Sequence, residues 1–138
     1  MNANLILFPV ISMLLLTTCI GLFMGYLRVR AVDKGELRIS YFRHNSGSEI
    51  STILARVSDN YDNLITSPMM FYVVVIMLYI SGNINQLQLI LAWGFVVTRL
   101  LHSFIHITTN NVIHRSASFL GGVMIVTAMW ILLVIEII

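Results

Sequence analysis

The chain has 138 residues, of which 58% are apolar and only 10% are charged, and its mean hydropathy is +0.90. Because soluble domains usually carry about 25% charged residues, this composition excludes an ordinary water-soluble fold and predicts an all-helical integral membrane protein. A net charge of +2 is too sparse for the basic face that nucleic-acid binding requires. Since each crossing needs about 20 apolar residues, residues 1–138 are expected to form one membrane domain, a bundle of four helices.

The first predicted span covers about residues 5–27. No charged residue occurs between Leu5 and Leu27, a run of 23 residues, and at about 1.5 Å per residue this run crosses a bilayer. The connector that follows, residues 28–50, holds five of the eight basic residues: Arg28, Arg30, Lys34, Arg38 and Arg43. The positive-inside rule therefore predicts a cytoplasmic connector and an external N-terminus.

Three further spans are predicted at about residues 51–81, 87–107 and 115–138. The second helix is expected to begin near Ser51, because residues 55–63 contain no Gly or Pro and nothing in them would end a helix. The turn at 81–86 is uncharged and is expected outside, whereas the turn before the fourth span carries His114 and Arg115 and is expected inside. The sequence thus predicts a multi-pass membrane protein with both termini on the external side.

The second and third spans each carry a polar stripe on an otherwise apolar helix. At about 100° per residue, one face of the second span collects Arg56, Asn60, Asn63 and Ser67, with Asp59 and Thr66 at its edge. The third span repeats polar residues at helical spacing: Arg99, His102, Ser103, His106 and Asn110. An Arg inside a span costs about 3 kcal/mol or more unless it is paired or wetted. The two stripes are therefore expected to face each other or a shared cavity.

Two explanations fit these stripes. In the first, Arg99 forms an ion pair with Asp59 or Asp62, and the two histidines complete the hydrogen bonding as structural groups. In the second, Arg56, Arg99 and Arg115 line a polar pocket near the cytoplasmic side, whose surplus positive charge favours an anionic ligand. A carboxylate or a lipid phosphate would satisfy that pocket equally well.

The pattern resembles the MAPEG family, the membrane-associated proteins in eicosanoid and glutathione metabolism, and in particular its bacterial members of unassigned function. The motifs cover nearly the whole chain and include Arg56-x3-Asn60-x2-Asn63, Pro68, Phe71-Tyr72, Arg99-x2-His102-x3-His106, and Arg115 at the start of the last helix. The resemblance implies a homotrimer of four-helix bundles in a bacterial inner membrane. It also implies three sites between neighbouring subunits, which open towards the cytoplasmic leaflet.

The family pattern also implies a ligand. In glutathione-binding members the second-helix pattern is Arg-x3-Asn-x2-Glu-x2-Pro, in which the Arg and Asn hold the carboxylates and backbone of the tripeptide and the Glu holds its ammonium. Here the glutamate position falls on Asn63, or on Thr66 if the helix is aligned on Asn63, so that the acid is missing unless Asp59 or Asp62 replaces it from a neighbouring turn. The two third-helix tyrosines of the family are histidines. The resemblance still implies that glutathione is bound as a co-substrate, by Arg56, Asn60, Asn63 and Arg99.

The catalytic hypothesis follows from thiol chemistry. Thiols ionise at about pH 8–9, and a nearby guanidinium lowers that pKa by stabilising the thiolate. By resemblance this guanidinium belongs to Arg115. Because histidine titrates near neutrality, His102 or His106 could take the thiol proton. The protein is thus a candidate glutathione transferase or peroxidase, acting on apolar electrophiles or lipid hydroperoxides.

Two alternatives remain open. A non-catalytic trimeric scaffold or accessory subunit, binding lipid or a partner complex, explains the missing family glutamate and tyrosines directly. Zinc bound by His102 and His106, with Asp59 or Asp62 as a further ligand, is a weaker possibility, because an i, i+4 histidine pair alone is not specific. We predict no metal site.

Overall fold

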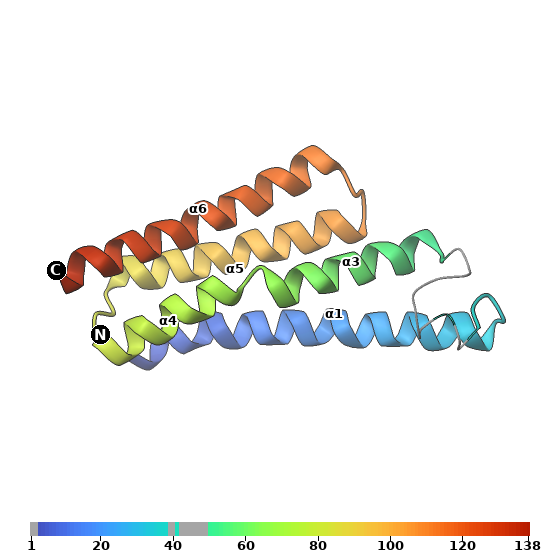
Figure 1. Cartoon of the computed structure of the whole chain (residues 1–138), viewed down its shortest axis with the longest axis horizontal. Coiled ribbons are helices and arrows are strands. Elements are labelled where there is room, and N and C mark those ends of the chain that lie inside the picture. The colour runs from blue at the N-terminus through green and yellow to red at the C-terminus, as the bar shows by residue number, and fades with distance from the viewer. Residues whose placement is uncertain (1–2, 39–40, 42–49) are drawn as a thin grey trace.

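The computed structural model describes residues 3–38, 41 and 50–138. These residues form four helical rods that lie side by side (Figure 1), each long and apolar enough to cross a bilayer. In chain order the elements are η1 (Ala3–Ile6) and α1 (Leu7–Asp33), α3 (Thr52–Thr66) and α4 (Met69–Ser81), α5 (Gln86–Ile107), and α6 (Val112–Ile137). The all-helical class with four candidate spans is confirmed, whereas the homotrimer stays a prediction.

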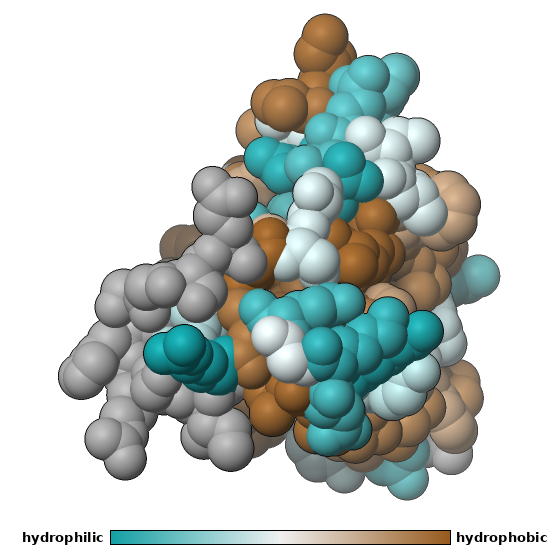
Figure 2. Space-filling view, turned by 90° about the vertical axis from the view of Figure 1, so that its right-hand side faces the viewer, coloured by the Kyte–Doolittle hydropathy of each residue, from teal (hydrophilic) through white to brown (hydrophobic). Residues whose placement is uncertain are grey.

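The two ends of the bundle differ in what they carry. Both chain termini and the α4–α5 turn lie at one end, the termini end, while the last turns of α1 and the α5–α6 turn lie at the other, the connector end (Figure 1). Figure 2 looks onto the connector end, where hydrophilic residues gather over the helix ends. Helix α1 continues to Asp33, beyond the predicted end at Leu27, so that Arg28 and Arg30 are helical. Arg43 lies outside the described residues.

Side-chain caps define where three of the helices begin. The Ser51 hydroxyl accepts a hydrogen bond from the Leu54 N–H at the start of α3, and the Asn85 side chain accepts one from the Gln88 N–H at the start of α5. At the start of α6, the Asn111 side chain accepts from two backbone N–H groups. Such caps satisfy N–H groups that have no partner inside the helix. The caps at Asn85 and Asn111 thereby fix the ends of the α4–α5 and α5–α6 turns.

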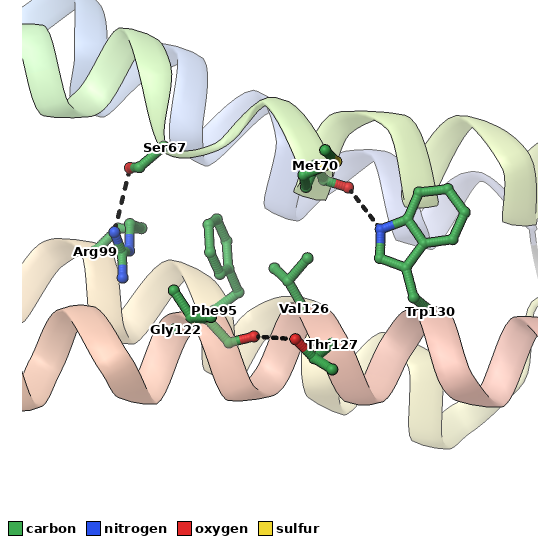
Figure 3. A pocket seen from close by; sticks show the side chains of 9 residues that line it. Ser67, Met70, Phe95, Arg99, Gly122, Val126, Thr127 and Trp130 are labelled. Atoms are coloured by element: carbon green, nitrogen blue, oxygen red, sulfur yellow. Dashed lines mark hydrogen bonds between the residues drawn. The ribbon is translucent and has the colours of Figure 1, made fainter.

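The second rod runs from Thr52 to Ser81, close to the predicted bounds of about 51–81, but it contains an interruption that was not predicted. Helix α3 ends at Thr66 and α4 begins at Met69, with Ser67 and Pro68 between them. Proline has no N–H to donate and its ring crowds the preceding turn, which interrupts a helix. At the interruption the Ser67 hydroxyl accepts from Arg99 on α5, and in the first turn of α4 the Met70 carbonyl accepts from the Trp130 indole N–H at 3.3 Å (Figure 3).

Apolar packing dominates the termini half of the bundle. The rings of Phe71 and Phe95 stack at 4.4 Å between centroids and join α4 to α5, with Met13 and Met129 fully buried in the same cluster. The buried polar residues of the connector half are Asn60, Arg99, His102, Ser103 and His106. The third-span stripe therefore turns towards the protein interior, as the cost of exposing it to lipid requires. On α3 only Asn60 of the predicted stripe is buried, and the other three members are half-buried.

Candidate functional site

Two cavities follow one another between α6 and the second rod, with α5 at their base. The polar cavity, of about 280 Å³, is lined by Asn63, His102, Arg115, Ser116 and Phe119. The apolar cavity, of about 190 Å³, lies next along the same elements and is shown in Figure 3. It is lined by Ser67, Met70, Phe95, Arg99, Gly122, Val123, Val126, Thr127 and Trp130. The site thus has a polar part towards the connector end and an apolar part deeper in the bundle.

Arg115 is the centre of the polar cavity. Its Nη1 donates to the Asn110 side-chain oxygen at 2.8 Å and contacts His106 Nε2 at 3.3 Å. Its backbone carbonyl lies 3.1 Å from His102 Nδ1 and accepts from the Ser118 hydroxyl at 2.9 Å. The three residues predicted to carry the chemistry, Arg115, His102 and His106, are therefore brought together from α5 and α6. Their catalytic roles stay predictions.

The partners of the two imidazoles assign their hydrogens. A carbonyl oxygen can only accept, so Nδ1 of His102 carries the proton and Nε2 of the neutral ring carries the lone pair. A guanidinium can only donate, so His106 Nε2 accepts from Arg115 and its Nδ1 carries the proton. Within the described part of the chain, His102 Nε2 has no hydrogen-bond partner. Of the two histidines, His102 is therefore the one whose lone pair has no protein partner, on a nitrogen that is itself buried.

Arg99 does not form the ion pair that the first explanation required, and that prediction is wrong. Arg99 is 2% exposed as a residue, and its guanidinium donates to the Ser67 hydroxyl at 3.2 Å and to the carbonyls of Ser118 and Phe119 at 3.4 and 2.9 Å. The rings of Phe95 and Phe119 flank it at 5.2 and 5.0 Å. Neutral acceptors and aromatic faces thus hold the charge, because the candidate aspartates lie on the exposed side of α3.

The other predicted ligand-binding residues occupy three different environments. Asn63 lines the polar cavity, and its amide N–H donates to the Asp59 carbonyl of its own helix at 2.9 Å. Arg56 donates instead to the Thr108 carbonyl at the end of α5, at 2.6 Å. Asn60 is fully buried on the inward face of α3. As described, neither Arg56 nor Asn60 lines either cavity, so their predicted contacts with glutathione remain untested.

The model of the MAPEG family matches residues 6–135. The chain belongs to the MAPEG family. Comparisons with curated proteins and with solved structures returned no match. Family membership and four apolar helices make the chain a multi-pass membrane protein of the lipid bilayer. They do not select an activity among those that MAPEG proteins carry, which include glutathione transfer and peroxide reduction.

The zinc alternative meets a geometric obstacle in this MAPEG protein. The Nε2 lone pair of His106 already accepts from Arg115, whose positive charge also opposes a cation at that atom. Residues 3–38, 41 and 50–138 contain no group of three His, Cys, Asp or Glu side chains that could hold a metal ion. The geometry of the polar cavity therefore fits an anion better than a cation.

Three residues of the site were missed at the sequence level. Phe119 lines the polar cavity and flanks Arg99, Ser116 lines the polar cavity, and Gly122 lies against the Arg99 guanidinium. Arg115, Phe119 and Gly122 share one face of α6 at spacings of four and three residues. The helical periodicity of α6 is thus a sequence signal for Phe119 and Gly122, because both lie on the face that carries Arg115.

Proposed function

We propose that this MAPEG protein binds glutathione, or another small thiol, in the polar cavity and uses it against apolar electrophiles or lipid hydroperoxides. The observation that carries this proposal is the pairing of Arg115 with His102 at one cavity. Of the three guanidinium nitrogens of Arg115, only Nη1 forms hydrogen bonds with the described residues. Nη2 and Nε are therefore left for a ligand. The cavity volume of about 280 Å³ is close to the lower bound of about 300 Å³ for small-molecule sites.

In the proposed chemistry the thiol proton passes to His102 Nε2, and the thiolate is stabilised by Arg115. In a transfer reaction the thiolate forms a carbon–sulfur bond, the electrophile releases its leaving group, and the imidazolium returns the proton to that group. In peroxide reduction the thiolate attacks the terminal peroxide oxygen and an alcohol leaves with the proton. A second thiol then converts the sulfenic acid into a disulfide and water.

The apolar cavity supports an apolar second substrate. It follows the polar cavity along α6, where Phe119 gives way to Gly122, Val126 and Trp130. An electrophile dissolved in the bilayer would place its apolar body there and its reactive atom towards Arg115. Apolar contacts favour such a ligand in proportion to the area that they cover.

We propose that the protein works as a homotrimer, as its family membership implies. The polar cavity opens between α3 and α6 at the surface of one subunit, so that a neighbouring subunit would complete its wall. We further propose that the connector end faces the cytoplasm of a bacterial inner membrane, because Arg28, Arg30 and Lys34 follow the apolar part of α1. Native mass spectrometry in detergent tests the first point, since any mass other than three chains contradicts it.

Calorimetry and a conjugation assay test the thiol proposal on purified protein. Wild-type protein is expected to give saturable heat with glutathione and to conjugate an apolar electrophile above the background rate. Arg115→Ala is expected to reduce kcat/KM about 100-fold or more, a magnitude typical of removing one stabilising donor. Arg30→Ala is the matched control. It removes the same charge at the connector end, where the Arg30 guanidinium donates to the Tyr26 hydroxyl one turn back in its own helix. Equal rates for Arg115→Ala and wild type would eliminate the proposal.

One observation favours the second candidate function, a non-catalytic scaffold that binds lipid or a partner complex. Asn63 stands where glutathione-binding relatives carry a glutamate, and its amide N–H is engaged with its own helix at Asp59. An amide cannot neutralise the ammonium of the tripeptide as a carboxylate does. The same calorimetry separates the two functions, because a scaffold gives no saturable heat with glutathione.

A further inference from the structure

The turn between α5 and α6 contains a residue with unusual backbone geometry. Asn110 has φ +51°, which among the described residues makes it the non-glycine with a positive φ. Its N–H donates to the Ile105 carbonyl at 2.7 Å and closes the end of α5. Asparagine and glycine are the residues that most readily adopt this left-handed conformation at a helix C-terminus. The backbone alone would therefore be satisfied by glycine.

The Asn110 side chain has a second role. Its Oδ1 accepts from Arg115 Nη1 at 2.8 Å, five residues along the chain and across the turn. The same Nη1 also meets His106 Nε2 at 3.3 Å. Two acceptors on one nitrogen fix the orientation of the planar guanidinium and leave its remaining edge for the polar cavity. Glycine at this position could not supply the first acceptor.

We infer that Asn110 is a positioning residue that holds Arg115 in place and thereby sets how strongly the polar cavity stabilises a thiolate. This inference rests on the proposed thiol chemistry. A neutral amide orients the guanidinium without cancelling its charge, whereas a carboxylate at the same position would neutralise it. The other charged groups that act on this part of the site are Arg99 on α5, and Arg56 and Asp59 on α3, so that cations prevail around Arg115.

Three variants separate positioning from structure. Asn110→Gly keeps the left-handed turn and removes the acceptor. Asn110→Asp keeps both the turn preference and an acceptor but adds a negative charge. Asn111→Ala is the matched control in the same turn, because the Asn111 side chain caps α6 by accepting from the Ile113 and His114 N–H groups. Its link to Arg115 is a main-chain bond, from the Arg115 N–H to the Asn111 carbonyl at 2.9 Å, which alanine retains. Each purified variant is titrated with pH in the presence of glutathione, and the ultraviolet absorbance of the thiolate and the thermal midpoint are recorded.

The substitutions at Asn110 are expected to change the thiol pKa, and the one at Asn111 is expected to change the thermal midpoint. In Asn110→Gly the pKa of bound glutathione rises by about one unit, which is about tenfold less thiolate below that pKa, while the thermal midpoint stays within 2 °C or so of wild type. Asn110→Asp raises the thiol pKa further. Asn111→Ala lowers the thermal midpoint and leaves the thiol pKa unchanged. An unchanged thiol pKa in Asn110→Gly, or an equal change in Asn111→Ala, overturns the inference.

A second readout needs no ligand and keeps the two proposals distinguishable. Nitrogen-15 NMR of the Arg115 guanidinium is expected to show a restricted Nη group in wild-type protein and a freely rotating one in Asn110→Gly. If wild-type protein leaves the thiol pKa of glutathione at its value in free solution, the proposed function fails and the NMR result alone decides whether Asn110 holds Arg115. An identical Arg115 signal in both proteins then overturns the inference.

Discussion

Gly122 faces the buried guanidinium of Arg99, and the substitution Gly122→Ala tests how tightly that charge is held. A Cβ at this position would overlap Arg99 Nη2, would lie 2.9 Å from Arg99 Cζ and would lie 2.8 Å from the Thr98 hydroxyl oxygen. Overpacking of this kind costs about 1–3 kcal/mol. If Arg99 retreats, it also weakens its hydrogen bonds to the Ser118 and Phe119 carbonyls, which in membranes contribute roughly 0.6–2 kcal/mol each.

The expected loss in the free energy of unfolding for Gly122→Ala is therefore roughly 2–5 kcal/mol. Gly121→Ala is the matched control, because its Cβ would meet only a Thr98 methyl group at 3.8 Å, and it is expected to gain up to about 1 kcal/mol from helix propensity. Unfolding in mixed detergent micelles with increasing dodecyl sulfate measures both variants. Combining Gly122→Ala with Arg99→Met should recover more than about 1 kcal/mol of the loss, as coupled neighbours do. Equal stability of the two alanine variants would refute the packing of Arg99 against α6.

Two further pairs of substitutions test the fold. Ser67→Ala removes the Arg99 Nη1 acceptor at 3.2 Å and is expected to lower the free energy of unfolding by about 1–2 kcal/mol. Thr66→Ala, whose hydroxyl bonds only to the Asp62 carbonyl one turn back, should change it by under about 0.5 kcal/mol; similar losses for both would contradict the Ser67 contact. In α1, Gly21→Ala would bring its Cβ to 2.8 Å from the Tyr61 ring and should cost about 1–3 kcal/mol. Gly25→Ala, with nothing within 4 Å of its Cβ, should gain up to about 1 kcal/mol from helix propensity. Unfolding in mixed micelles measures all four variants, and a stabilising Gly21→Ala would show that α1 and α3 pack less closely than described.

The four apolar rods could be predicted from the sequence, because bilayer thickness sets the length of an uncharged apolar segment that crosses it, whatever the tertiary contacts are. The grouping of His102, His106 and Arg115 could be anticipated as well, since helical periodicity places the two histidines on one face and a short turn brings the next helix back. The break at Pro68 was missed although its cause is visible in the sequence. The apolar run on both sides of Pro68 indicates a membrane span, but a hydropathy pattern does not show where the helix within that span is interrupted.

The environment of Arg99 could not be predicted from residue types. Residue types made an aspartate partner one of two explanations, but the acceptors that hold the guanidinium include backbone carbonyls of α6, which every residue possesses and no pattern reveals. The guanidinium can lie this close to α6 because Gly122 has no Cβ at the contact. The positive φ of Asn110 and its bond to Arg115 are likewise products of the turn geometry. Polar contacts to main-chain atoms are therefore the part of this site that required the structure.

The most direct test of the central claim is an experimental structure of the purified protein in lipid nanodiscs with glutathione added. The account predicts density for the tripeptide in the polar cavity, with its sulfur beside the free edge of the Arg115 guanidinium and within hydrogen-bond reach of His102 Nε2. Density for an acyl chain or a lipid headgroup in that cavity at saturating glutathione would contradict it.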